Sequence, residues 1–241
     1  VQSKALIELP KLPQIVSGFD SKNINLAKKL FAKICGEIIE TSVLEAELIK
    51  LFSNANRYIN FSIANQLYII CNHFELDFKR VREIMRNGYE RNLNLSNSGF
   101  TAGPCLLKDT MQLTSFYKKK LDLGYAAMKV NESFPDLIIK KLSKIKNVKK
   151  KNIGLLGLAF KAETDDTRDS LSIKLLKILK KKKYKVLQSD EYYKNSKNIS
   201  ANLLIKKSDI IILGAPHKSY SKLKISNKKQ LIDIWGFFKK F

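Results

Sequence analysis

The segment from Gly99 to Asp109 gathers small residues, a thiol and two opposite charges in one short stretch. Cys105 is a candidate nucleophile, because a thiol reacts as its thiolate and a nearby cation or helix N-terminus favours that form. Lys108 and Asp109 supply a cation and a carboxylate shortly after it, and Gly103 leaves room for a ligand to approach the backbone. The alternative is a structural thiol, since free cysteine is among the most buried residue types.

A second pair of candidates, Lys50 and Asn54, is four positions apart in a stretch with helical periodicity. Residues with this spacing leave the same helix face one turn apart. An ammonium and a carboxamide aimed together can stabilise a developing oxyanion. The alternative is a solvated lysine beside an incidental asparagine, and the spacing alone leaves both interpretations open.

A third set of polar residues follows a short apolar strand expected over 153–158. Ligands of doubly wound sheets bind at the carboxyl ends of the strands. We therefore expect Phe160, Lys161 and Arg168 to meet an anion, and also the loop 215–217. The Gly-x-x-Gly spacing in this strand is only part of the dinucleotide fingerprint and does not by itself indicate NAD.

The elements that must position these residues change in type near residue 146. Before it, apolar residues recur at the spacing of amphipathic helices, and Ser42 and Glu45 form a capping-box signature at the head of a long helix. After it, apolar strands alternate with a helix, which is the βαβ pattern of a parallel sheet. The expected helices cover 23–39, 44–74, 77–87, a segment beginning at Asp109, a segment from Ala126 past Pro135 to Leu142, and 170–182; the expected strands cover 153–158, 185–188, 210–214 and 231–234.

The composition narrows the classes of partner. The 241 residues carry a formal net charge of +23, which invites a polyanion, but the excess is mostly lysine in runs, and only six residues are arginine. A solvated basic surface is the expected explanation, with no nucleic-acid partner. There is no signal peptide and no run of about 18 apolar residues, so we expect no membrane partner. Three scattered cysteines without metal-ligand spacing favour a reducing, cytoplasmic compartment and no metal site.

Four segments resemble, in order and spacing, the UDP-glucose/GDP-mannose dehydrogenases, which oxidise nucleotide sugars to uronic acids. They are Leu9 to Gly18, Ala46 to Asn54, Gly99 to Asp109, and Gly157 to Arg168. The resemblance implies an α/β fold in which a central all-helical domain with one long helix precedes a Rossmann-like parallel-sheet domain. It also implies an oxidoreductase of polysaccharide biosynthesis that converts the C6 alcohol of a nucleotide sugar, expected to be a UDP-sugar, to a carboxylate in two steps with NAD.

The resemblance assigns roles to individual residues. Cys105 matches the nucleophile that forms a thioester, Lys50 and Asn54 match the oxyanion-stabilising pair, and Asp109 matches the carboxylate that helps to activate water. The remaining matches are to substrate contacts at Phe100, Gly103, Phe160 and Lys161, and to cofactor contacts at Lys108 and Arg168.

The resemblance also has a gap, because no counterpart of the family's first NAD-binding domain precedes Val1. We therefore expect a truncated chain with little turnover of its own, in which 1–22 is a remnant of that domain, 23–145 is the central dimerisation domain and 146–241 binds the nucleotide sugar. The family's homodimer forms through the central helix. A non-catalytic nucleotide-sugar-binding or dimerisation fragment is the alternative, followed by a basic nucleic-acid-binding protein.

Overall fold

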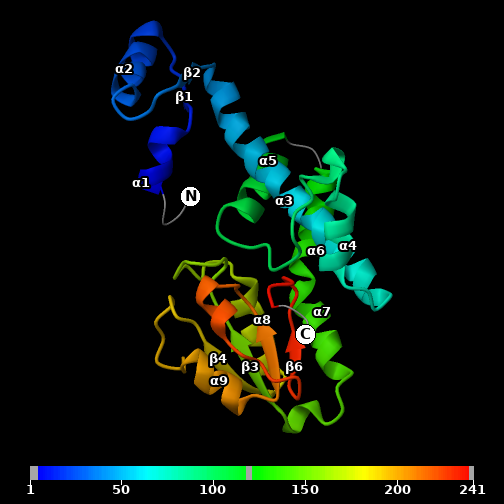
Figure 1. The fold of residues 1–241 in the computed structure, drawn as a ribbon. Helices are drawn as coiled ribbons and strands as arrows, with labels where there is room; N and C mark the ends of the chain where they lie inside the picture. Colours follow the sequence, from blue (N-terminus) through cyan, green and yellow to red (C-terminus); the bar gives the residue numbers. More distant parts are fainter. Residues whose placement is uncertain (1–4, 118–120, 239–241) are drawn as a thin grey trace.

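The computed structural model describes residues 5–117 and 121–238, and Figure 1 shows a long helix that joins a small β-α-β unit at one end to a helical region and a sheet domain at the other. The helices are α1 Ala5–Glu8, α2 Ser21–Phe31, α3 Val43–His73, α4 Phe78–Arg86, α5 Leu106–Tyr117, α6 Asp122–Glu132, α7 Phe134–Ser143, α8 Leu171–Lys181 and α9 Ala201–Lys207. The strands are β1 Gln14–Val16, β2 Ile38–Glu40, β3 Asn152–Leu156, β4 Lys185–Ser189, β5 Ile210–Leu213 and β6 Gln230–Ile232. The predicted α/β class, with helices first and a parallel sheet after them, is confirmed.

The β-α-β unit consists of β1, α2 and β2, with the two strands paired in parallel. Asp20 caps α2, since its carboxylate accepts a hydrogen bond of 2.7 Å from the backbone N–H of Asn23. The prediction of helix through Ile39 was wrong, because Ile38 and Ile39 lie in β2. The unit spans residue 22, where the sequence suggested a domain boundary.

Helix α3 is 31 residues long and begins at the predicted capping box. The backbone N–H of Glu45 donates to the Ser42 hydroxyl, and the Glu45 carboxylate accepts from the backbone N–H of Ser42 at 2.9 Å. Hydrogen bonds from Thr41 and Ser42 lower the pKa of Glu45 to about 2. Helices α5 and α6 pack along α3, and the side chains buried there include Asn54, Tyr58 and Asn65.

We call residues 99–109 the thiol segment. The helices that begin in it or after it differ from the predictions at their ends. Helix α5 begins at Leu106, so Asp109 lies in its first turn and not at its start. The predicted continuous helix through Pro135 is two helices, α6 and α7. Proline lacks a backbone N–H and is accommodated in a first helical turn, so Pro135 lies at the head of α7.

The sheet domain has four parallel strands in the order β4-β3-β5-β6. Alternate residues of each strand face opposite sides. Leu155 and Ile212 pack with α7 and α8 on one face, whereas Leu156 and Ile211 pack with α9 on the other. Helix α9 was not predicted; Ser200 caps it, and its seven residues are too few for a clear periodic pattern. Within the described residues, no helix is long and apolar enough to cross a membrane.

Candidate functional site

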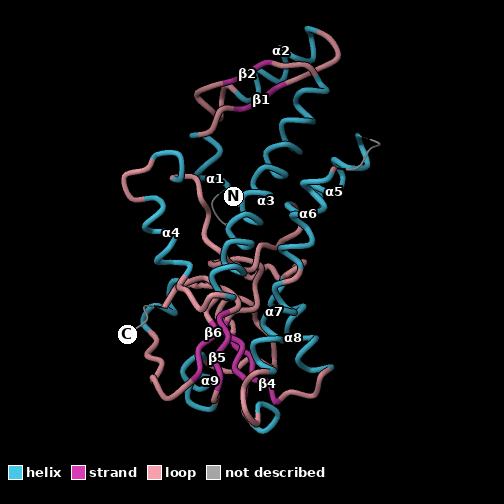
Figure 2. The backbone as a smooth tube through the Cα atoms, turned by 90° about the vertical axis from the view of Figure 1, so that its right-hand side faces the viewer, coloured by secondary structure: helices cyan, strands magenta, loops and turns pink. Residues whose placement is uncertain are grey.

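The thiol segment leads into α5 and approaches the sheet domain at Gly99 and Gly103. Figure 2 shows loops between the helices and the sheet domain. All three cysteines lie in described residues: Cys105 is exposed, whereas Cys35 and Cys71 are buried. Cys105 directly precedes α5, and its carbonyl accepts a 2.8 Å hydrogen bond from the backbone N–H of Asp109. The exposed thiol therefore stands at the positive end of a 12-residue helix.

Asp109 brings three of the predicted residues together. Its Oδ2 accepts a hydrogen bond of 2.6 Å from Asn54 Nδ2 and lies 3.6 Å from Lys50 Nζ. Its Oδ1 lies 3.7 Å from Lys108 Nζ. Asn54 and Asp109 are buried, while both lysine side chains are about two-thirds exposed. Each of these cations consequently keeps N–H donors that can face a ligand above the buried pair.

A buried asparagine network holds the start of the thiol segment. The Asn65 side chain, fully buried, donates to the carbonyl of Gly99 at 3.1 Å and accepts from the backbone N–H of Gly99 at 2.9 Å. It also donates to Asn131 Oδ1 at 2.8 Å, and Asn131 in turn donates to the carbonyl of Tyr58. Helices α3 and α6 thus fix the backbone at Gly99 through side-chain amides. Sequence reasoning missed Asn65, although an asparagine within the apolar run of a long helix was a visible signal.

The sheet domain fixes the same segment from the other side. The Ser98 hydroxyl donates to the carbonyl of Ile234 at 2.6 Å. A side chain at Gly99, whose φ is +151°, would run into the ring of Trp235. A Cβ at Gly103, whose φ is +110°, would lie 2.6 Å from the Phe160 ring. Both glycines are therefore required by the close approach of an aromatic ring from the sheet domain.

Two of the predicted ligand contacts, Phe160 and Lys161, lie at the carboxyl end of β3 beside the thiol segment. Both residues are half-buried, and Lys161 Nζ lies 5.7 Å from the centre of the Phe160 ring. Phe160 is held by a hydrogen bond of 3.0 Å from its backbone N–H to the carbonyl of Asp166. The Phe160 ring packs against Gly103, and the ammonium group of Lys161 near this ring therefore lies on the side of the thiol segment.

Arg168 is exposed and is held by Asp166 through a 2.7 Å contact from Nη2 to Oδ2. The hydrogen bonds to Asp166 and its charge raise the pKa of Arg168, with smaller contributions from Cys105 and Asp169. Phe100 differs from the other predicted contacts, since its side chain is 2% exposed and belongs to the sheet-domain core. Only its backbone can meet a ligand.

Asp190 and His217 form a buried polar centre at the carboxyl edge of the sheet. Asp190 Oδ2 accepts from the backbone N–H groups of Leu158 at 2.6 Å and Ala159 at 3.1 Å, and lies 3.2 Å from His217 Nε2. Its Oδ1 accepts from two further backbone N–H groups, at Tyr192 and Tyr193. Burial alone would raise the pKa of Asp190, but these hydrogen bonds outweigh burial and lower the pKa to about 2.

His217 corrects the expectation that the loop 215–217 meets an anion, because its ring is completely buried. Its Nδ1 accepts from the backbone N–H of Glu163 at 3.0 Å, so the proton resides on Nε2 and is donated to Asp190. Glu163, Glu191 and His217 bring three potential metal-ligand atoms within 4.8 Å of one another. Both nitrogens of His217 are already hydrogen-bonded, however, so this ring has no nitrogen left for a metal.

The same centre decides whether the sheet domain fits a dinucleotide. A pyrophosphate on a Rossmann sheet binds the free backbone N–H groups that follow the first strand. Here the N–H groups of Leu158 and Ala159, which follow β3, both donate to the Asp190 carboxylate. The turn after β3 therefore does not fit NAD. Among the described residues that were predicted to contact this cofactor, the exposed cations Lys108 and Arg168 remain suited to an anionic pyrophosphate.

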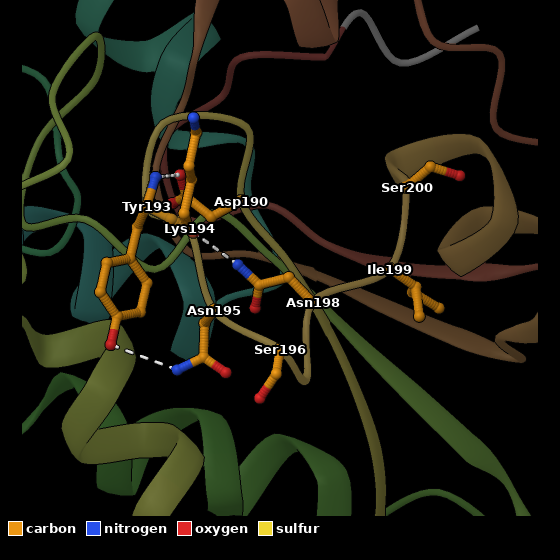
Figure 3. A pocket seen from close by; sticks show the side chains of 8 residues that line it. All are labelled: Asp190, Tyr193, Lys194, Asn195, Ser196, Asn198, Ile199 and Ser200. Carbon is orange, nitrogen blue, oxygen red and sulfur yellow. Dashed lines mark hydrogen bonds between the residues drawn. The ribbon is translucent and has the colours of Figure 1, made fainter.

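A cavity of about 530 Å³ lies beyond the end of β4, and Figure 3 shows the eight side chains that line it. None of the predicted site residues lines this cavity. Its polar groups bond to one another: Asn198 Nδ2 donates to the carbonyl of Tyr193 at 2.6 Å, and Asn195 Nδ2 donates to the Tyr193 hydroxyl at 3.3 Å. The lining residues are Asp190, Tyr193, Lys194, Asn195, Ser196, Asn198, Ile199 and Ser200.

Known proteins resemble this chain both in sequence and in three-dimensional structure. Over 223 residues it is 28% identical to the UDP-N-acetyl-D-mannosamine dehydrogenase of Pyrococcus horikoshii, covering 90% of this chain and 53% of that protein. The solved structure of the Pyrococcus horikoshii enzyme matches with a TM-score of 0.83 at 27% identity, over 93% of this chain and 55% of that one.

The GDP-mannose 6-dehydrogenase of Pseudomonas aeruginosa strain PAO1 is 26% identical, over 98% of this chain and 60% of that protein. The chain therefore spans between about half and three-fifths of the length of these relatives. The model of the UDP-glucose/GDP-mannose dehydrogenase family's central domain matches residues 44–133, and the model of its UDP binding domain matches residues 154–240. The chain belongs to the UDP-glucose/GDP-mannose dehydrogenase family.

Proposed function

We propose that this chain forms the thiol and nucleotide-sugar part of an NAD-dependent nucleotide-sugar 6-dehydrogenase, which oxidises the C6 alcohol of a UDP-sugar to a carboxylate. The observation that carries the proposal is the exposed Cys105 at the head of α5, one turn before a buried Asp109 that contacts both Lys50 and Asn54. The match of 154–240 to a UDP binding domain supports the choice of substrate class.

In the proposed reaction the Cys105 thiolate attacks the C6 carbon of the intermediate aldehyde. The C–S bond forms as the carbonyl π electrons move to oxygen, which gives a thiohemiacetal oxyanion. Lys50, with its free N–H donors, and the second N–H of Asn54 stabilise this oxygen. Asp109 acts at this stage as a positioning residue, because it holds both donor side chains in place.

NAD supplies the hydride acceptor for each of the two oxidations. Loss of hydride from the thiohemiacetal carbon leaves a thioester on Cys105. Water then attacks the thioester carbonyl, and Asp109 accepts the water proton while the oxyanion is held as before. Collapse of the tetrahedral adduct breaks the C–S bond, which returns the Cys105 thiolate and releases a carboxylic acid that loses its proton to solvent. Asp109 also passes its proton to solvent, so one oxygen from water is added to the product and the chain is regenerated.

The remaining predicted contacts receive roles in this proposal. Lys161 pairs with a phosphate of the nucleotide sugar, and the Phe160 ring, packed at Gly103, forms the wall beside it. Lys108 and Arg168 face the cofactor pyrophosphate from the side of the thiol. Phe100 contributes through its backbone, since its side chain is buried in the core.

We also propose a homodimer through α3. The supporting observation is the set of large apolar side chains that this helix leaves exposed. Exposed apolar residues gathered on one element are a feature of interaction surfaces. The exposed residues include Leu44, Ile49, Phe52, Ile63 and Ile70.

The experiment that tests the proposal measures the rate at which iodoacetamide alkylates each cysteine, by peptide mass spectrometry. We expect Cys105 to react first, UDP-N-acetylmannosamine to slow its reaction, and the corresponding C6 aldehyde to slow it further by forming the thiohemiacetal. Buried Cys35 and Cys71 serve as internal controls. Lys50→Met should weaken protection by the aldehyde about tenfold and leave protection by the alcohol unchanged, because only the adduct carries an oxyanion.

Equal protection by the alcohol and the aldehyde would contradict covalent catalysis and favour the non-catalytic binding fragment. In the presence of a dinucleotide-binding domain and NAD, Cys105→Ser should stop carboxylate formation, and undiminished acid production by that variant would refute the thioester route. We expect little NADH formation by the 241 residues alone, because the turn after β3 does not accept a dinucleotide.

A further inference from the structure

A second charged surface lies at the opposite end of the sheet domain from the thiol segment. The parallel strands place all their amino ends at one edge, at the lower end of the molecule in Figure 1. The four segments that lead into β3, β4, β5 and β6 meet at this edge, and we call their lysines the lysine edge. Its members are Lys144, Lys146, Lys149, Lys150, Lys151, Lys180, Lys181, Lys182, Lys183, Lys185, Lys206, Lys207, Lys228 and Lys229.

Contacts between the four segments confirm that they form one surface. Lys149 Nζ donates to the carbonyl of Lys182 and lies 3.7 Å from the centre of the Tyr184 ring. Lys229 Nζ donates to the carbonyl of Lys206 at 3.2 Å. The side chain of Asn152 donates to the carbonyl of Lys207 at 3.1 Å. Segments whose contacting residues are up to 55 positions apart in the sequence thus meet at this edge.

The acidic residues of the sheet domain are segregated from the lysine edge. Asp209 is the one acidic residue within the four described segments, and its carboxylate accepts from the backbone N–H of Asn152 at 2.8 Å. The other acidic residues of 154–238 all follow carboxyl ends of strands: Glu163, Asp165, Asp166, Asp169, Asp190, Glu191 and Asp233. A composition rich in lysine explains the number of cations but not this separation of the two signs.

Some lysines of the lysine edge have local structural roles that explain their positions without a ligand. Lysines in the last turns of α8 and α9 interact favourably with the helix dipole. Lys180 also donates to Gln188, and Lys229 donates to backbone carbonyls. Lys144, Lys150 and Lys228 are exposed, and the described residues give them no acidic partner. Cations on one surface repel one another wherever they lie closer than a Debye length, about 8 Å at physiological salt, and a polyanion would relieve this repulsion.

We propose that the lysine edge docks the protein on the surface of a bilayer that contains anionic lipids. Lysine ammonium groups attract anionic headgroups without specific geometry, and several near the surface act together. Recognition of nucleic acid instead favours arginine forks and exposed aromatic rings for stacking. The lysine edge contains no arginine, and its aromatic ring, Tyr184, is half-buried beneath Lys149.

Docking of this kind leaves the candidate active site accessible, because the thiol segment and the lysine edge lie at opposite ends of the strands. It also needs no apolar span. The expectation of no membrane partner rested on the absence of such a span, and the present proposal departs from it because adsorption requires none. This proposal is independent of the proposed dehydrogenase activity.

The test is co-sedimentation of the 241-residue chain with vesicles of phosphatidylcholine, alone or mixed with an equal part of phosphatidylglycerol, at physiological salt. We expect binding to the mixed vesicles only, and release at high salt. The variant Lys150→Gln/Lys182→Gln/Lys206→Gln/Lys228→Gln removes one exposed lysine from each segment. Each lysine contributes about a fivefold factor, so its affinity should fall more than about a hundredfold.

The matched control is Lys11→Gln/Lys22→Gln/Lys29→Gln/Lys33→Gln, which removes the same charge from exposed positions in and around α2. We expect this variant to keep most of the binding. Equal losses in the two variants would overturn the proposal, because net charge and not the lysine edge would then be responsible. Failure of the unaltered chain to bind mixed vesicles, or displacement from them by a small amount of mixed-sequence RNA, would overturn it as well, the latter by assigning the surface to nucleic acid.

Discussion

Replacing Asp190 with asparagine removes a buried carboxylate that accepts hydrogen bonds from four backbone N–H groups and from His217. An asparagine has one acceptor oxygen. If that oxygen faces Tyr192 and Tyr193, the NH₂ group meets the N–H groups of Leu158 and Ala159, which are donors as well. His217 cannot compensate by exchanging its tautomer, because Nδ1 already accepts from a backbone N–H.

At least two buried donors thus lose their partner in this variant. Each such loss costs about 1–3 kcal/mol, so we expect Asp190→Asn to lower the free energy of unfolding by about 3–5 kcal/mol at neutral pH. Urea unfolding followed through the fluorescence of Trp235 measures this directly, since it is the single tryptophan and lies in the sheet domain.

The pH dependence gives a second, independent readout. The pKa of Asp190 is lowered from 3.8 to about 2, so its charge stabilises the fold fully above pH 4 and the stabilisation is lost as the pH falls towards 2. The lost stabilisation is about 2 kcal/mol, at about 1.4 kcal/mol per pKa unit. We expect the variant to lack this acid-dependent loss, so the difference in stability between the two proteins should narrow by about 2 kcal/mol at low pH.

Asp209→Asn is the matched control, because Asp209 is exposed and the amide oxygen can still accept from the backbone N–H of Asn152. Its effect should stay below about 1 kcal/mol. A difference of less than 1 kcal/mol between Asp190→Asn and the unaltered chain at neutral pH, or the same acid dependence in both, would refute the assignment of five donors to this carboxylate.

Three further variants test the thiol segment. Gly99→Ala forces a methyl group against the Trp235 ring, so the free energy of unfolding should fall by about 2–4 kcal/mol. The fluorescence emission of Trp235 in the folded protein should also change, and an unaltered emission would mean that the ring does not contact residue 99. Asn65→Leu leaves Gly99 and Asn131 without their amide partner; we expect a similar loss and faster alkylation of Cys105, and an unchanged alkylation rate would argue against a clamp. In the presence of a dinucleotide-binding domain, NAD and the nucleotide sugar, Asp109→Asn should slow thioester hydrolysis about a hundredfold, seen by mass spectrometry as accumulated acyl-protein, and its failure to accumulate would exclude Asp109 from water activation.

Local signals in the sequence predicted much of the helical region. The capping box at Ser42 and Glu45 depends on two residues three positions apart, and the structure contains it as predicted. The spacing of Lys50 and Asn54 predicted a shared helix face, and both side chains meet Asp109. Contacts along one helix are set by the local period, which the sequence displays directly.

The errors arose where tertiary structure overrides local pattern. Ile38 fits a helical period but pairs with β1 in a parallel ladder, a partner more than twenty residues away. Pro135 divides one apolar period into α6 and α7. Phe100 matches a contact motif by position, yet its side chain faces the sheet-domain core because Gly99 turns the backbone against Trp235.

The polar centre of Asp190 and His217 could not be predicted as a pair. The two residues are 27 positions apart and come together only because β4 and β5 flank β3 in the sheet. A usable signal existed, since Asp190 directly follows the strand β4, where a carboxylate can accept from the neighbouring turn. Strand order decides which turn that is, and the sequence does not specify strand order by pattern alone.

The contacts of Ser98, Gly99 and Gly103 with the sheet domain limit how parts can be exchanged among members of this family. A sheet domain transplanted from a relative to change nucleotide preference must bring a ring that fits over Gly99 and another that fits over Gly103. A donor with a bulkier residue than glycine on its own thiol segment will have shaped its domain to a different surface. The practical unit of exchange therefore includes residues 98–103 together with Phe160 and Trp235, and a junction placed at the charged segment before β3 would separate parts that were fitted to each other.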